Sequence, residues 1–529
     1  MLQPTERPAG YFTDSEPLGP IATPERMDEV GYRILFDRDN LLFSKLSVDE
    51  LDGPIIVVGR RGSGKTAFLK STHFAHPRSI VIEMVPSETF RNIVSSINHL
   101  AKISNAFVED VRDIWNNLFW ITAFQETYLR HQTLNENVHI ETIKRFLMSA
   151  GIKNPSQTYE IFGHILSILE RRYNAEGTLS LLKKAFKRRS PTFDEARVAM
   201  DEFLREKNLR VFFLLDNLEY FELEKDEMTK AIAGLTKCVS EFRRARDRHH
   251  LRWCVPAELY HQIIDLSTNP LKDFSQQILL HWHAGEILQL AAVRYASYLK
   301  IHENEFYKRK IEKMILKDRS EIASFWKIVL PARVVNGFGR EEDSVAYILR
   351  HTQLLPRQIL RYLNAIISYN VKEYGSRFTI ESDSITSKIR DIEGVVAREI
   401  CTAFGSTYPK AYRACEATLP NLPYVFKNGD LQKTFTRFGK RLGVFEDFDH
   451  FRRMMIEIGA IGVVTGETEY YFSGIFEYTE PYKLSVASDD VLCLHPIFFR
   501  TFRTNFDVNW KPVYPYGTDP ESPDRRMNV

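Results

Sequence analysis

The sequence predicts an α/β fold in which a parallel sheet with a large helical insertion is followed by a helical region and a smaller α+β domain. Three observations predict it. Short apolar runs alternate with helical segments between residues 54 and 282, the pattern of a parallel sheet with helical crossovers. Residues 87–208 have helical periodicity and almost no strand signal. After residue 381, helices precede strand-like segments of alternating polarity.

The predicted sheet has five strands, each a short apolar run of the kind that parallel sheets bury on both faces. In chain order they are Pro54–Gly59, Ser79–Val85, Leu209–Phe221, Leu251–Val255 and Gln276–Trp282. Within the insertion, residues 108–131 form a predicted helix, one face of which consists of Val111, Ile114, Trp115, Leu118, Phe119 and Thr122.

At 529 residues the chain is long enough for about three domains. We expect a core over residues 28–284, a lid of helices only over residues 285–380 and a winged-helix-like domain over residues 381–512. The clearest lid helix begins near Pro356. Residues 1–27 are expected to form a flexible arm and residues 513–529 a disordered tail, because both are rich in Pro, Gly and polar residues.

Composition excludes several classes of protein. The net charge of +2 shows no basic excess over the whole chain, so any surface for DNA must be a local patch. The five cysteines are scattered, which argues against a disulfide framework or a structural zinc site. No signal-peptide core opens the sequence and no run of about 18 apolar residues occurs. We therefore expect a cytoplasmic protein with no membrane contact.

One motif carries chemistry. Residues 59–66 read GRRGSGKT and fit G-x-x-x-x-G-K-[ST] at every position, between an apolar strand and an apolar-periodic helix. Such a loop turns its backbone N–H groups toward phosphates, while the lysine reaches the outer phosphate oxygens and the threonine hydroxyl binds Mg²⁺. The predicted core is thus a P-loop NTPase core. Its predicted nucleotide-binding residues are Gly59, Arg60, Arg61, Gly62, Ser63, Gly64, Lys65, Thr66 and Ala67.

A second element is Asp216, which follows the most hydrophobic strand, as a Walker-B carboxylate does. Asp216 and Thr66 are the predicted metal ligands, and Lys65 and Asp216 are predicted to act in catalysis. The alternative is that Asp216 only caps the next helix. Two residues could orient the attacking water. Glu219 is a candidate base, and Asn217 could instead position water without accepting its proton.

The order of the glycine loop, the strand before Asp216 and the lid helix near Pro356 resembles the STAND and origin-recognition-type branches of AAA+-related P-loop ATPases. Bacterial P-loop ATPases with the same order of segments are similar. The resemblance rests on GRRGSGKT, LLDNLE and LLPRQILRYLNAI and covers roughly residues 28–370. It implies ATP and Mg²⁺ as cofactors and a lid arginine, Arg357, that touches the γ-phosphate. Pro256 departs from the family's first sensor, for which Glu258 and Arg252 are poor substitutes.

The resemblance also implies a nucleotide-controlled switch or assembly ATPase that acts as a homo-oligomer or through a partner effector protein, for example in bacterial antiphage defence or a stress response. One alternative is a DNA-associated ATPase that binds duplex through Arg452, Arg453, Arg500 and Arg503 of the winged-helix-like domain. Another is a non-catalytic module that holds nucleotide.

No guanine-reading NKxD follows the core, which favours ATP over GTP. Arg243 or Arg244 could reach a neighbour's ATP or lie at a solvated helix end. The basic helix Leu181–Ser190 could contact phosphates or present a solvated face.

Overall fold

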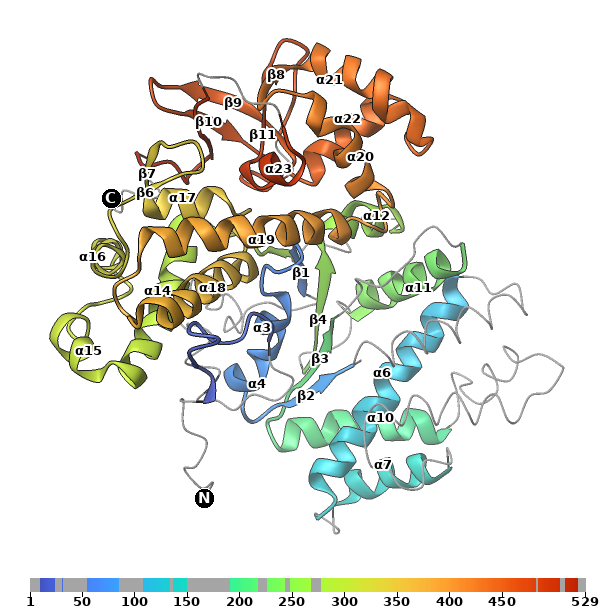
Figure 1. The fold of residues 1–529 in the computed structure, drawn as a ribbon. Coiled ribbons are helices and arrows are strands. Elements are labelled where there is room, and N and C mark those ends of the chain that lie inside the picture. The colour runs from blue at the N-terminus through green and yellow to red at the C-terminus, as the bar shows by residue number, and fades with distance from the viewer. Residues whose placement is uncertain are drawn as a thin grey trace. The chain divides into compact units, whose positions relative to one another are not determined.

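The structure is a computed structural model, shown in Figure 1. It describes residues 10–23, 31, 55–84, 108–133, 137–149, 191–216, 226–242, 248–267, 277–481, 484–504 and 510–521. The chain divides into two compact units, each described by itself. The core unit comprises Leu41–Arg60 and Lys65–Leu280, and the C-terminal unit comprises Met1–Asn40, Arg61–Gly64 and His281–Val529.

The core unit contains the predicted parallel sheet. Its strands are β1 (Ile55–Gly59), β2 (Ile80–Glu83), β3 (Val211–Leu215), β4 (His249–Pro256) and β5 (Gln277–Leu279). They lie in the order β2-β3-β4-β1-β5, and every neighbouring pair is parallel. All residues of β1 and β3 are buried, as their apolar sequences require. The predicted fold class is confirmed, although β3 is shorter than expected and ends just before Asp216.

Helices of the core unit include the predicted insertion helix over residues 108–131. The described helical elements are α3 (Lys65–Lys70), α4 (Thr72–Ala75), α6 (Val108–His131), α7 (Val138–Ser149), α10 (Pro191–Glu206), α11 (Asp226–Phe242), η3 (Ala257–Leu259) and α12 (Tyr260–Asp265). In α6, Val111, Trp115, Leu118 and Phe119 of the predicted face are buried. Figure 1 shows α6 alongside α11, and α10 packs on α7. The core of this unit therefore extends from the sheet into the insertion.

The first part of the C-terminal unit is helical, with one exception. Its elements are α14 (Ala284–His302), α15 (Asn304–Lys310), α16 (Arg319–Val329), β6 (Arg333–Val335), β7 (Glu341–Asp343), α17 (Ser344–Arg350) and α18 (Pro356–Tyr374). The expectation of helices only is wrong here, because β6 and β7 form an antiparallel hairpin. Its turn is held by Asn336, whose side-chain oxygen accepts the backbone N–H groups of Phe338 and Arg340.

The second part of this unit is the predicted winged-helix-like α+β domain. Its helical elements are α19 (Ser382–Ala403), α20 (Ala411–Thr418), η4 (Leu419–Asn421), α21 (Asn428–Thr434), η5 (Phe435–Gly439), η6 (Lys440–Leu442), α22 (Phe448–Glu457) and α23 (Pro496–Thr501). Its strands are β8 (Val425–Lys427), β9 (Ile461–Glu467), β10 (Phe472–Ile475), β11 (Val491–Leu494) and β12 (Val513–Pro515). They form one sheet in the order β12-β10-β9-β11-β8.

Both predicted loose ends are partly ordered. In the N-terminal arm, Phe12 and Leu18 are fully buried, and the Leu18 N–H donates to the side-chain oxygen of Asn364 at 2.7 Å. Arg294 donates to the carbonyl oxygens of Leu18 and Pro20. In the tail, β12 pairs in parallel with β10. A flexible arm and a disordered tail are therefore wrong for residues 10–23 and 513–521. Local composition suggested loops, but the contacts that hold these segments come from distant parts of the chain.

Among the residues that the structure describes, no helix combines the length and the apolar character needed to cross a bilayer.

Candidate functional site

The glycine loop has the backbone conformation that its sequence predicts. It begins where the buried strand β1 ends at Gly59 and finishes where α3 begins at Lys65. Gly62 and Gly64 have φ angles of 92° and 97°, which residues with a Cβ rarely adopt. The two glycines are therefore required by the path of the loop itself.

The loop also has the features that would fit a phosphate group. A Cβ built on Gly64 would meet no atom within 4 Å, so there is open space beside this glycine. Ser63 is 1% exposed, and its hydroxyl has no hydrogen-bond partner among the described residues. A buried polar atom without a partner is unusual in a folded protein, and a bound anion or water would satisfy it.

Lys65 is buried at the start of α3, and its ammonium group lies over the loop. Its Nζ donates to the carbonyl oxygens of Gly59 at 2.8 Å and Arg60 at 3.2 Å. A buried ammonium needs such acceptors, since burial without them is costly. The lysine is thus held at the loop, on carbonyl groups that a phosphate oxygen could replace.

The pair Thr66 and Asp216 joins the two predicted motifs. Thr66 Oγ1 donates to Asp216 Oδ2 at 2.6 Å, across 150 residues of sequence. The pair forms because β1 and β3 both run parallel to β4 and lie on either side of it, so their carboxyl ends meet at one edge. A hydroxyl and a carboxylate are oxygen ligands of the kind that Mg²⁺ prefers.

The tip of the loop, residues 61–64, belongs to the C-terminal unit and has two contacts there. The Arg357 backbone N–H, at the start of α18, donates to the Gly62 carbonyl oxygen at 3.3 Å. Trp282 Nε1 donates to the Ser63 carbonyl oxygen at 2.8 Å. The sequence singled out Arg357 but not Trp282, since no local pattern marks an indole as a partner of a distant carbonyl.

Strand β4 carries both Pro256, which stands where a first sensor is expected, and the candidate Arg252, and the two lie at different distances from the loop. Pro256 is paired in register with Gly59, so the position next to the loop lacks a polar side chain. Arg252 pairs with Ile55, at the opposite end of β1, and donates to Thr72. Its burial lowers the pKa of the guanidinium to about 10. Arg252 is therefore a buried residue of the central strand β4, at the end of β1 away from the loop, where a sensor would not lie.

Several predicted residues lie outside the described residues. These are Asn217 and Glu219, the two candidates for orienting water, Arg243 and Arg244, and the basic segment Leu181–Ser190.

The four arginines suggested for DNA have different environments. Arg452 is half-buried on α22 and forms an ion pair with Asp449 at 3.0 Å. Arg453 is exposed. Arg500 and Arg503 line a pocket of the C-terminal unit.

Comparison with known proteins finds no family model and no curated protein that matches this chain. Among solved structures, it is similar to Cdc6p from Pyrobaculum aerophilum, with 11% identity, coverage of 92% of this chain and 97% of that chain, and a TM-score of 0.28. It is also similar to the ORC2 protein of Aeropyrum pernix, with 12% identity, coverage of 91% and 94%, and a TM-score of 0.34. At these values neither protein tells which molecules this chain binds.

Proposed function

We propose that this chain is a P-loop ATPase that binds ATP with Mg²⁺ and uses hydrolysis to switch between conformations. The observation that carries the proposal is the 2.6 Å hydrogen bond between Thr66 and Asp216, beside a loop with two left-handed glycines. Neither feature alone identifies such a site, since glycine turns and strand-end aspartates are common. Their meeting at one sheet edge is what a site for a nucleotide and its metal requires.

In the proposed site, each residue has a separate task. The backbone N–H groups of residues 60–66 bind the phosphates, and Lys65 Nζ leaves the carbonyls of Gly59 and Arg60 to contact a phosphate oxygen. Thr66 and Asp216, now joined by a hydrogen bond, would hold Mg²⁺ through their oxygen atoms. When bound, Mg²⁺ neutralises the charge that develops on the phosphoryl oxygens.

For the attacking water, we propose Glu219 as the base, with Asn217 as the alternative that positions water only. The two assignments predict different rates. Replacement of a true base, Glu219→Gln, lowers turnover by about 10²–10⁴-fold and leaves ATP binding intact. If Asn217 only positions water, Glu219→Gln changes little and Asn217→Ala lowers the rate instead.

We propose Arg357 as the residue that senses the bound nucleotide, because its backbone N–H already contacts the loop tip at Gly62 within the same unit. Output would then pass through a change of shape, a homo-oligomer or a partner protein. Mass photometry of the wild type and Arg357→Ala, with and without ATP and Mg²⁺, tests this. The expected result is ATP-dependent assembly in the wild type that Arg357→Ala lacks while still binding ATP. Identical mass distributions in the two proteins would contradict the role.

The primary experiment measures binding of labelled ATP and release of phosphate. Lys65→Ala and Asp216→Asn should lose binding or turnover, and Lys70→Ala, on the same helix as Lys65 but at its other end, is the matched control. Turnover by the wild type that Lys65→Ala abolishes supports the ATPase. Binding without turnover supports the non-catalytic module, and no binding at saturating Mg²⁺ refutes both.

We also propose a cellular role for this ATPase, in bacterial antiphage defence or a stress response. Plaque counts on cells that express the wild type or Lys65→Ala test it: protection that needs Lys65 supports this role, and equal counts refute it.

A further inference from the structure

A second concave site lies within the C-terminal unit. It has a volume of about 280 Å³ and is lined by residues from the β6–β7 turn, α17, α19, α23 and the segment before β12. The lining includes Phe338, Glu393, Arg390, Arg500, Arg503 and Trp510, and no residue of the glycine loop. Its volume lies just below the range for small-molecule sites, about 300–1,000 Å³. It has room for one ligand of mononucleotide size.

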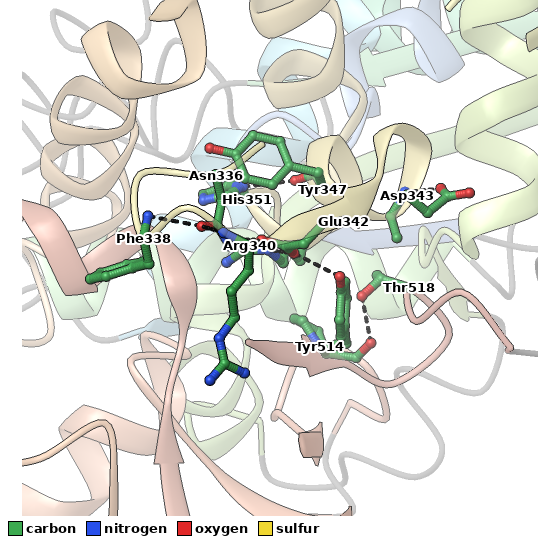
Figure 2. Close-up of polar contacts among 12 residues, drawn as sticks. Asn336, Phe338, Arg340, Glu342, Asp343, Tyr347, His351, Tyr514 and Thr518 are labelled. Carbon is green, nitrogen blue, oxygen red and sulfur yellow. Dashed lines mark hydrogen bonds and ion pairs between the residues drawn. The ribbon is translucent and has the colours of Figure 1, made fainter. Parts of the chain in front are cut away.

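One wall of this pocket is held by a buried polar network, part of which, including Glu342 and Tyr514, is shown in Figure 2. Glu342, with a side chain 2% exposed, accepts from both Arg350 Nε and Nη2, at 2.8 and 2.9 Å. It also accepts from Asn336 Nδ2 and from the Tyr514 hydroxyl, each at 2.6 Å. The charges of Arg350 and Glu342 are thus matched, and the carboxylate accepts four hydrogen bonds. Such a network gives the pocket wall a single, rigid arrangement.

The same network positions an aromatic side chain at the pocket. Asn336, fixed by Glu342, accepts the backbone N–H of Phe338 at 2.8 Å (Figure 2). Phe338 nevertheless remains 50% exposed, with its ring centroid 4.3 Å from that of the buried Trp510. A large apolar ring held at the surface by a turn offers a face on which a planar group can stack.

The rim of the pocket is cationic and its interior contains a buried carboxyl group. Arg390, Arg500 and Arg503 are all exposed. The Glu393 side chain is 7% exposed, its Oε1 has no hydrogen bond among the described residues, and Arg500 Nε lies 3.7 Å from it. Burial raises the pKa of Glu393 to about 8, against the opposing effect of Arg500. A raised pKa favours the uncharged form of this acid at neutral pH, and the uncharged form leaves the positive charge of the rim uncancelled from inside.

We propose that this pocket binds a phosphorylated ligand of mononucleotide size, with its planar base on Phe338 and its phosphate on the rim arginines. The Glu393 carboxyl group offers a hydrogen bond to the ligand's interior end. Arginine suits phosphate because its planar donors bind two oxygens at once. This site is separate from the proposed ATP site and would make the chain responsive to a second small molecule.

The test is calorimetric titration of the full chain with AMP, UMP, ribose 5-phosphate and inorganic phosphate. The background is Lys65→Ala, which removes the proposed ATP site from the measurement. On this background, Arg500→Ala should weaken binding of AMP and of ribose 5-phosphate by about tenfold. Phe338→Ala should weaken AMP by about tenfold and leave ribose 5-phosphate unchanged, because only the base stacks. Arg413→Ala, an exposed arginine outside the pocket, is the control and should change nothing.

Three outcomes would overturn the proposal. They are no binding of AMP or UMP at millimolar concentration, equal affinities in all variants, or affinity for inorganic phosphate equal to that for AMP. Circular dichroism of each variant verifies that it is folded. Because ATP turnover is measured separately in the wild type, failure of the ATPase leaves this result intact, and failure of this site leaves the ATPase intact.

Discussion

Burial of Glu393 makes the stability of the C-terminal unit depend on pH. Its carboxyl group has a pKa of about 8 in the folded chain, against an ordinary value of 4.5. Burial is the main cause, and Arg500, Arg350 and Arg390 oppose it. The perturbation we consider is Glu393→Gln, which keeps the size of the side chain and removes its titration.

The sign of the effect follows from proton counts. Between pH 4.5 and about 8 the folded chain holds the proton and the unfolded chain does not, so the free energy of unfolding falls as pH rises. While this difference in bound protons persists, a rise of one pH unit lowers the free energy of unfolding by about 1.4 kcal/mol. From pH 6 to pH 8 the wild type should lose about 2 kcal/mol through this group, and Glu393→Gln should lose none of it.

Hydrogen exchange of the α19 amides measures this locally, without requiring the two units to unfold together. For amides that exchange through unfolding of this unit, the ratio of wild-type to Glu393→Gln rates should rise about thirtyfold between pH 6 and pH 8. Glu399→Gln is the control, since Glu399 lies on the same helix but is exposed and pairs with Arg361 at 2.6 Å. A ratio that stays constant with pH would refute the reasoning.

Three further predictions concern other parts of the chain. Arg350→Leu leaves the Glu342 carboxylate buried without its cation and should lower the free energy of unfolding by about 3–5 kcal/mol, measured by urea titration. Deletion of residues 1–23 removes the carbonyl acceptors of the buried Arg294 and should lower the melting temperature; an unchanged value would mean that the arm is dispensable. Gly64→Ala forces a Cβ into a left-handed position beside the loop, and should abolish ATP binding while costing about 1–2 kcal/mol of stability.

Much of the core unit could be predicted because its signals are local. A buried parallel strand must be apolar along its length, so β1 and β3 were visible as runs of Val, Ile, Leu and Phe. The loop after β1 needs glycine at its left-handed positions, and its function needs lysine and threonine. Asp216 was found because it ends such a run, and parallel pairing then brought it to Thr66.

What could not be predicted depends on distant contacts. Strands β6 and β12 have three residues each, too few to show an alternating pattern. Tyr514 is held by Glu342, 172 residues away, and Leu18 by Asn364, 346 residues away. Composition around these residues resembles loops, and only the folded chain supplies their partners. The pocket at Phe338 could not be predicted either, because its lining residues come from distant parts of the sequence, between residues 336 and 510.

The most direct test of the central claim is equilibrium binding of labelled ATP to the full chain at saturating Mg²⁺. The wild type and Lys70→Ala should retain ATP, and Lys65→Ala should not. Asp216→Asn should retain ATP but lose most of its Mg²⁺ dependence, because this carboxylate is the proposed metal ligand. Failure of the wild type to bind ATP, or equal binding by Lys65→Ala, would contradict the account.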